Sequence, residues 1–359
     1  MSDAPVGCRS HVVTVGGGRV HCVEAGEGPL VLLVHGFPES WYSWRHQLPA
    51  LAAAGYRAVA IDVRGYGRSS KPQAVEDYRM VRLVADNVGL VGALGHDTAV
   101  IIGHDWGAPI AWSSAMLRPD VFTAVAGLSV PFAPPSDVRP STAMRAMAGD
   151  EEFYVEYFQE PGRAEAEIEA DVRDWLLGFM FTASGDAPPP DIANGTVATV
   201  RRGGLMKDRF HRPDPMPAWL TETDLDVYAN EFEHSGLRGP LNRYRNVDRD
   251  WEDLAAFRGA RIDVPALFIG GDRDGLGRCR CRRAGGLHRS SVSRQLAPSP
   301  IWSGTALASS STARSACPGG ASRPRRARPI ARRIEQLVIV GPSPSSWPMC
   351  HSPRRIRGL

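Results

Sequence analysis

The first part of this chain contains short runs of apolar residues that are typical of β-strands. The runs Val12–Val15 and Arg19–Glu24 flank Gly16-Gly-Gly18, and this pattern predicts a β-hairpin. Leu30–Val34 and Tyr56–Ile61 are continuous apolar runs, which are typical of strands that are covered on both faces of a sheet. The opening part of the chain therefore predicts four strands.

The alternation of strands with helices continues to about residue 130. Residues 79–94 have the apolar spacing of a helix, and Thr98–Ile102 predicts a buried strand. The helix that follows runs to about Leu117, and Phe122–Val130 predicts the next strand. Strands that alternate with helices in this way indicate an α/β fold with a doubly wound, mostly parallel sheet.

The pattern changes after Phe132. Residues 133–250 are rich in Trp, Tyr, Pro and acidic helical segments and contain no good strand, so they predict a helical lid inserted between two strands of the sheet. Residues 1–132 then form the first part of the core, and 251–275 resume it with the strand Pro265–Gly271. Asp272 and Asp274 follow this strand, at the sheet end where catalytic groups of α/β proteins collect.

The segment 276–359 differs from the rest of the chain. It contains 16 Arg, no Lys and one acidic residue, Glu335, although the net charge of the whole chain is only +3. Its only apolar strand-like run is Leu337–Val340. Three interpretations fit: a disordered basic tail, a tether for an anionic surface or nucleic acid, or a change of reading frame in a GC-rich gene. In each case this tail lies outside the predicted core.

Several classes of protein are not expected. The chain has no apolar run of 18 residues, and its first residues lack the pattern of a signal peptide, so we expect a cytoplasmic protein with free thiols and no membrane contact. The pair Cys279 and Cys281 has no partners at zinc spacing, and Gly65-x-Gly67 is too short for a dinucleotide site. We therefore expect neither a metal nor an organic cofactor. A nucleic-acid partner is not expected either, because a change of reading frame is the interpretation of the tail that we favour.

The run Gly103-His-Asp-Trp-Gly107 carries the most specific chemistry. A nucleophile between two small residues, on the turn from a strand to a helix, has the pattern of a nucleophile elbow. The middle residue is Asp105, and a carboxylate there attacks an alkyl carbon to give an alkyl ester, whereas a serine would attack an acyl group. An aspartate that only caps the helix is the simpler alternative.

Through about residue 275 the chain resembles the soluble epoxide hydrolases of the α/β-hydrolase fold, close to the mycobacterial type. The resemblance covers roughly three quarters of the chain. The matching motifs are the elbow, His35-Gly-Phe-Pro-Glu-Ser-Trp41, Asp62-x-Arg-Gly-Tyr-Gly-x-Ser69, Ser129-Val-Pro-Phe132, Tyr154-Val-Glu-Tyr-Phe-Gln-Glu-Pro-Gly162 and Gly239-Pro-Leu-Asn-Arg-Tyr-Arg-Asn246.

This resemblance implies conversion of epoxides to vicinal diols, a detoxification reaction that needs no cofactor, and assigns a role to each matched residue. Asp105 is the nucleophile, and Tyr154 and Tyr244 donate hydrogen bonds to the epoxide oxygen. A phenol suits this task because it is neutral at pH 7 and can share its proton with a developing alkoxide. The N–H groups of Phe37 and Trp106 form the oxyanion hole, and the loops around it are shaped by His35, Gly36, Pro38 and His104, with a cis bond expected at Pro38. Tyr157 and Tyr228 are expected to pack.

The catalytic histidine is where the chain departs from the family. Asp274 matches the acid that orients this histidine, with Asp272 as a weaker candidate. The family histidine lies roughly 30 residues after the acid, but the sequence near residue 305 contains none. Only His288 and His351 follow Asp274, and neither has the expected neighbours. We therefore expect the release of the ester to be impaired.

Three other functions are weighed against epoxide hydrolysis. Haloalkane dehalogenases also have an Asp-Trp elbow, but they usually carry Asn at the position of Phe37 and lack the tyrosine pair. Aspartate at 105 disfavours an esterase. A hydrolase-shaped remnant or binding protein stays an alternative because the histidine is missing, and the oligomeric state, including a homodimer, is left open.

Overall fold

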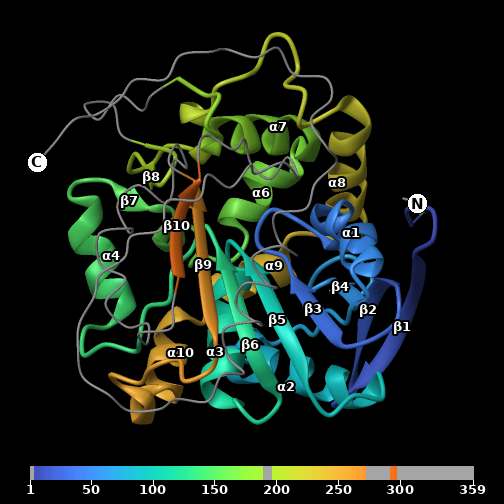
Figure 1. Ribbon diagram of the computed structural model, residues 1–359. Helices are drawn as coiled ribbons and strands as arrows, with labels where there is room; N and C mark the ends of the chain where they lie inside the picture. Colours follow the sequence, from blue (N-terminus) through green and yellow to red (C-terminus); the bar gives the residue numbers. More distant parts are fainter. Residues whose placement is uncertain (1–3, 189–195, 272–291, 297–359) are drawn as a thin grey trace, which may run out of the picture.

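The computed structural model describes residues 4–188, 196–271 and 292–296 (Figure 1). Its centre is a sheet with the strand order β1-β2-β4-β3-β5-β6-β9-β10. β1 pairs with β2, and β2 with β4, in antiparallel fashion, whereas all the other neighbours are parallel. The strands are β1 (Arg9–Val15), β2 (Gly18–Ala25), β3 (Leu30–Val34), β4 (Arg57–Ile61), β5 (Ala99–His104), β6 (Phe122–Leu128), β9 (Ala266–Gly271) and β10 (Val292–Leu296).

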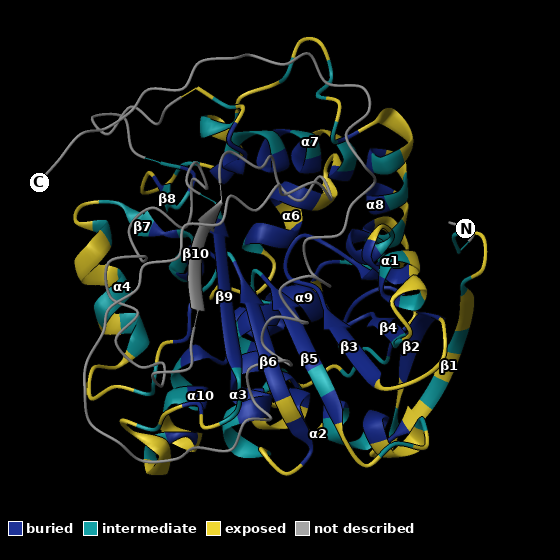
Figure 2. Cartoon of the chain, viewed as in Figure 1, coloured by how far each residue is buried: buried dark blue, intermediate teal, exposed yellow. Residues whose placement is uncertain are grey.

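The strands β3, β4, β5, β6 and β9 are largely buried on both faces, as their continuous apolar runs predict (Figure 2). In β3, Leu30, Leu32 and Val34 pack in one apolar cluster with residues of α2 (Met80–Ala93) and α3 (Gly107–Leu117). Val31 and Leu33 point to the other face and pack with residues of α1 (Gln47–Ala53). Helices therefore cover both faces, and the predicted doubly wound α/β-hydrolase fold is confirmed.

The register of the sheet brings two loops together. Val34, the last residue of β3, pairs with Gly103 in β5, and His104 pairs with Leu128 in β6. Because these strands are parallel, their carboxyl ends lie at one edge of the sheet. The loop after β3, which begins at His35, therefore lies beside the turn that carries Asp105.

The segment between β6 and β9 is mainly helical, and we call it the insertion (133–250). In Figure 1, α6 and α7 lie beyond the end of the sheet toward which β9 points. The insertion was predicted to contain no strand, but the two-residue strands β7 (Glu152–Phe153) and β8 (Thr199–Val200) pair with each other, because such short pairings need no apolar alternation. Its helices are α4 (Pro140–Ala148), α5 (Tyr154–Tyr157), α6 (Arg163–Glu169), α7 (Val172–Ala183), α8 (Glu222–Ser235) and α9 (Arg238–Tyr244), and α10 (Val247–Asp253) begins within it and ends three residues past its boundary.

One segment of the basic tail joins the sheet. β10 runs parallel to β9, with Val292 opposite Leu267, where no strand was expected. Its sequence, Val-Ser-Arg-Gln-Leu, has no apolar alternation, so the strand follows from backbone pairing with β9. The other predictions for 276–359, including the tail's origin and the roles of His288 and His351, fall outside the described residues, as does the assignment of Asp274.

Candidate active site

Asp105 lies on the tight turn between β5 and α3. Its φ angle is +47°, in the left-handed region that few residues other than glycine adopt. A Cβ atom at Gly103 would overlap the carbonyl oxygen of Gly107, and one at Gly107 would overlap that of Val34. Both neighbours of the elbow are therefore glycine because backbone segments cross there without space for a side chain.

The Asp105 carboxylate is held by main-chain donors. The Phe37 N–H donates to Oδ1 of Asp105 at 2.9 Å, and the Trp106 N–H also donates to this carboxyl group. The Phe37–Pro38 bond is cis. The structure thus brings both predicted oxyanion-hole residues to the oxygen atoms on which charge would develop.

The surroundings of Asp105 also change its acidity. Burial raises the pKa of the Asp105 carboxyl to about 6, although the charge of His104 and the hydrogen bonds from Phe37 and Trp106 oppose this rise. Asp105 is therefore mostly ionised at neutral pH. An ionised carboxylate in an apolar site is a reactive nucleophile that needs no base.

His35 fixes the loop that carries Phe37. Its Nδ1 lies 2.8 Å from the carbonyl oxygen of Gly36, and its Nε2 accepts a hydrogen bond from the Val63 N–H at 3.1 Å. Burial lowers the pKa of the His35 imidazole, so the ring is neutral. Both ring nitrogens are occupied by the backbone, which suits a structural role.

His104 belongs to a second buried network. Its Nδ1 lies 2.9 Å from Oε2 of Glu39, and its Nε2 lies 3.3 Å from Oγ of Ser129, whose φ angle is also positive. The same Glu39 oxygen accepts a hydrogen bond from the Gly36 N–H at 3.1 Å. Glu39 was part of a quoted motif but received no role from the sequence, and it joins the two loops.

The two predicted acids meet at Trp106. Tyr154 is the first residue of α5, and its hydroxyl accepts a hydrogen bond from Nε1 of Trp106 at 3.2 Å. Tyr244, the last residue of α9, has its ring edge-on to Trp106 at 4.9 Å and to Tyr154 at 6.0 Å. Burial, followed by the neighbouring Tyr154 and Asp105, raises the pKa of Tyr244 well above its usual value, so its hydroxyl stays protonated.

A buried ion pair lies behind Trp106. The Arg243 guanidinium is 5.1 Å from the centre of the Trp106 ring, and its Nη1 donates to Oδ2 of Asp250 at 2.6 Å. Asp250 also accepts a hydrogen bond from the Met80 N–H, at the start of α2. This pair could not be predicted from the sequence, because its members come from α9 and α10 and meet only in the folded chain.

Aromatic rings form the apolar part of the site. The Phe37 ring makes edge contacts with five other rings at centroid distances of 5.6–6.5 Å, those of Phe158, Trp175, Phe179, Phe232 and Tyr244. The two tyrosines expected to pack do so. The Tyr157 hydroxyl donates to Oε2 of Glu167 at 2.5 Å, and the Tyr228 hydroxyl lies 2.9 Å from Oγ of Ser43.

Gly36 provides a direct test of this geometry. An added Cβ at Gly36 would overlap the Asp105 carboxyl itself, so Gly36→Ala is expected to displace the carboxylate. A displacement of about 1 Å lowers the rate of ester formation with an epoxide by about 10²-fold. Mass spectrometry of the labelled protein measures this rate.

Gly92→Ala in α2 is the matched control, because an added Cβ there has no heavy atom within 4 Å and should change neither the rate nor the fold. Equal rates of ester formation in both variants would contradict the geometry of the site.

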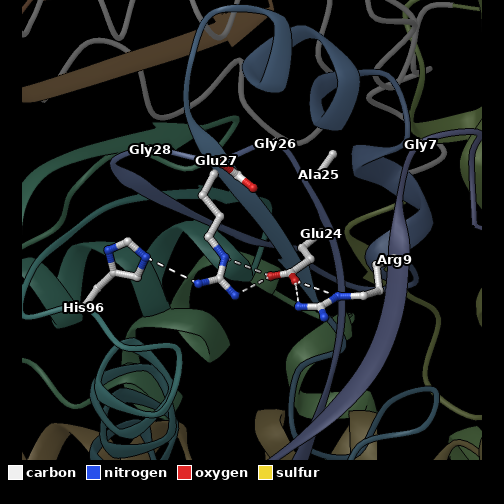
Figure 3. A pocket seen from close by; sticks show the side chains of 9 residues that line it. Gly7, Arg9, Glu24, Ala25, Gly26, Glu27, Gly28 and His96 are labelled. Atoms are coloured by element: carbon white, nitrogen blue, oxygen red, sulfur yellow. Dashed lines mark hydrogen bonds and ion pairs between the residues drawn. The ribbon is translucent and has the colours of Figure 1, made fainter.

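A second hollow lies at the amino ends of the parallel strands (Figure 3). It has a volume of about 540 Å³. Glu24 accepts hydrogen bonds there from Arg9, at 3.0 Å from Nε, and from Arg57, at 2.8 Å from Nη2. The Glu24 carboxylate thus pairs with both guanidinium groups and ties β1, β2 and β4 together, so we assign the hollow a structural role.

The described residues contain neither a metal-binding cluster nor a membrane-spanning helix. Within residues 4–188 and 196–271, no group of three or more His, Cys, Asp or Glu side chains is arranged to hold a metal ion. Among the helices that the structure describes, none is long and apolar enough to cross a lipid bilayer.

Comparisons with known proteins agree with this geometry. Residues 29–278 match the model of the alpha/beta hydrolase fold family. Over 291 residues the chain is 46% identical to Epoxide hydrolase B of Mycobacterium tuberculosis, which covers 72% of this chain and 82% of that protein. It is 40% identical to Bifunctional epoxide hydrolase 2 of Mus musculus over 280 residues, which cover 75% of this chain and 49% of that protein.

Solved structures show the same relationship. An epoxide hydrolase from an endophytic Streptomyces is 58% identical, with a TM-score of 0.79, and the match covers 82% of this chain and 90% of that one. Epoxide Hydrolase A from Mycobacterium thermoresistibile is 44% identical, with a TM-score of 0.76 and coverage of 81% and 91%. Fold, motifs and relatives agree: this chain belongs to the epoxide hydrolases of the α/β-hydrolase fold.

Proposed function

We propose that this chain opens epoxides through an ester between Asp105 and the substrate, and that it releases the diol slowly. The observation that carries this proposal is the placement of Asp105. Its carboxylate accepts a hydrogen bond from the Phe37 N–H at 2.9 Å. Its negative charge helps to raise the pKa of the buried Tyr244. A nucleophile, two main-chain donors and two phenols thus gather at one edge of the sheet.

In the first half-reaction, an Asp105 oxygen attacks a ring carbon of the epoxide. The carbon–oxygen bond of the strained ring breaks, its electron pair goes to the epoxide oxygen, and a tyrosine supplies the proton. The Tyr154 oxygen accepts the Trp106 Nε1–H at 3.2 Å, and the Tyr154 hydroxyl is one of the two proton donors that we propose. The hydrogen bond from Trp106 also favours the phenolate that forms.

In the second half-reaction, water attacks the carboxyl carbon of the ester. Negative charge then builds on the Asp105 oxygen, within reach of the Phe37 and Trp106 N–H groups. The water must lose a proton to a base. His35 has both ring nitrogens on the backbone, and His104 has Glu39 and Ser129 on its two ring nitrogens. We therefore propose that this step is slow, with Asp274 as the acid that a histidine would need.

A single-turnover reaction with styrene oxide in ¹⁸O-labelled water tests both steps. We expect one styrene oxide per chain to become attached to the peptide that contains Asp105. When this ester is slowly hydrolysed, ¹⁸O should appear in Asp105 and not in the diol, because water attacks the carboxyl carbon and the original Asp105 oxygen leaves with the product.

The outcomes separate the alternatives. Absence of any ester at Asp105, with styrene oxide bound reversibly, would identify a binding protein. Release of halide from a chloroalkane at a comparable rate would identify a dehalogenase. Diol formation over many equivalents would show that a histidine completes the site and would refute the proposal of slow release.

We also propose a cellular setting. Removal of reactive epoxides in the cytoplasm is the role that fits an epoxide-opening site together with the free thiols of Cys8 and Cys22.

We also propose that the protein forms a homodimer, and the mass of the native protein in solution tests this proposal.

A further inference from the structure

Three polar residues outside the Asp105 site form a hydrogen-bonded series. The Ser10 hydroxyl lies 2.9 Å from Nε2 of His21, and Nδ1 of His21 lies 2.7 Å from Oδ2 of Asp62. A hydroxyl, an imidazole and a carboxylate joined in this order have the arrangement that activates a serine nucleophile. Neither the sequence motifs nor the epoxide reaction uses Ser10 or His21.

The register of the sheet creates this arrangement. In the β1–β2 hairpin, His21 lies opposite Val12, which places its side chain on the same face as Ser10 two residues away. β2 pairs in turn with β4, which ends at Ile61, and the Asp62 N–H donates to the carbonyl oxygen of His21 at 3.0 Å. β1 and β2 thus supply Ser10 and His21, and the residue that follows β4 supplies Asp62.

The protonation of the series follows from its hydrogen bonds. Burial raises the pKa of the Asp62 carboxyl, but hydrogen bonds from His21 and the Trp41 N–H, together with nearby imidazoles, lower it below its usual value. An ionised Asp62 can only accept, so His21 carries its proton on Nδ1. With the proton on Nδ1, Nε2 can accept a hydrogen bond from the Ser10 hydroxyl, which lies 2.9 Å away.

Solvent exposure increases along the series from Asp62 to Ser10, as a nucleophilic serine requires. Asp62 is 0% exposed and His21 is 2% exposed, whereas Ser10 is exposed to solvent. The carboxylate and imidazole are therefore fixed in the protein, and only the hydroxyl faces a reagent. β1 is also the edge strand of the described sheet, so alternate N–H groups along its outer side are open to a carbonyl oxygen.

We propose that Ser10 is a second nucleophile, which accepts acyl groups from activated carboxylic esters. Oγ of Ser10 forms a bond to the carbonyl carbon while its proton passes to Nε2 of His21. The ester's alcohol leaves with that proton, and water, deprotonated by the same nitrogen, then releases the carboxylic acid. The overall reaction is ester plus water to acid plus alcohol. It is independent of Asp105, which lies on the turn after β5, and β2, β4 and β3 separate β5 from β1 in the sheet.

The test uses the full chain carrying Asp105→Asn, so that the first nucleophile does not react. The reagents are a fluorophosphonate probe and p-nitrophenyl acetate. The tryptic peptide 10–19 contains Ser10 as its only serine. We expect one fluorophosphonate on this peptide, attached at least about 10²-fold faster than in the same chain unfolded in urea. Ser10→Ala should remove the label and lower the release of p-nitrophenol at least tenfold.

Thr14 provides the matched control. It is an exposed hydroxyl on the same strand, and Thr14→Ala should leave both reactions unchanged. Epoxide opening by Asp105, measured in the Ser10→Ala single variant, should also be unchanged. Labelling of other residues, or equal rates in the folded and unfolded chain, would overturn the proposal and leave the series as a purely structural link between strands.

Discussion

Asp105→Asn is expected to lower the rate of ester formation with styrene oxide by about 10⁴-fold or more, because the amide is a far weaker nucleophile than the carboxylate. Asparagine tolerates the left-handed backbone conformation of residue 105, so the elbow keeps its shape. The measurement is the mass of the intact protein during incubation with excess epoxide. A variant that still gains one styrene oxide would show that another residue is the nucleophile.

The pH dependence of the wild-type reaction provides the control. Since the pKa of Asp105 is about 6, the rate should be constant above pH 7 and fall about tenfold per unit well below pH 6.

The raised pKa of Asp105 also predicts that the wild type loses stability as the pH rises through 6, because the folded state binds this proton more tightly than the unfolded state. Asp105→Asn does not titrate, so its stability relative to wild type should increase by about 1.4 kcal/mol from pH 5 to pH 7.5. The same difference at both pH values would contradict the assignment.

Replacing both Tyr154 and Tyr244 with Phe is expected to slow ester formation by about 10³-fold or more, whereas each single replacement costs less because the other phenol can still donate. Both tyrosines contact Trp106: the Tyr154 hydroxyl accepts its N–H, and the Tyr244 ring packs edge-on against it. The single-turnover rate with styrene oxide at pH 8 measures the effect.

Tyr157→Phe and Tyr228→Phe are the controls for the tyrosine pair. Their hydroxyls bond to Glu167 and Ser43, away from Asp105, so each variant should keep the wild-type rate within a few fold, although some stability is lost. A rate in the double variant that matches these controls would show that the two phenols do not act on the epoxide.

Much of the fold could be predicted because the central strands β3 to β6 are largely buried on both faces. Leu30–Val34 is predicted from five consecutive apolar residues, and β3 has the same bounds. β10 could not be predicted, because its sequence has no apolar pattern and its pairing depends on the open edge of β9. β7 and β8 are too short for any periodicity to appear.

The predictability of the site differs between short-range and long-range contacts. Asp105, Phe37 and the two tyrosines follow from local motifs, and the structure places them around Trp106. The buried pair of Arg243 and Asp250, and the rings packed on Phe37, come from separate helices of the insertion. Local sequence patterns do not predict which helices pack together, so these contacts become visible only in the folded structure.

Gly36, Gly103 and Gly107 all lack space for a Cβ atom, but Asp105 is the cause at only one of them. Gly103 and Gly107 are restricted by main-chain oxygens, which stay in place whatever residue occupies position 105. Gly36 alone is restricted by the Asp105 side chain. Evolution can therefore exchange the nucleophile, and with it the reaction class, without rebuilding the turn. The residue expected to co-vary with such an exchange is Gly36, on the neighbouring loop.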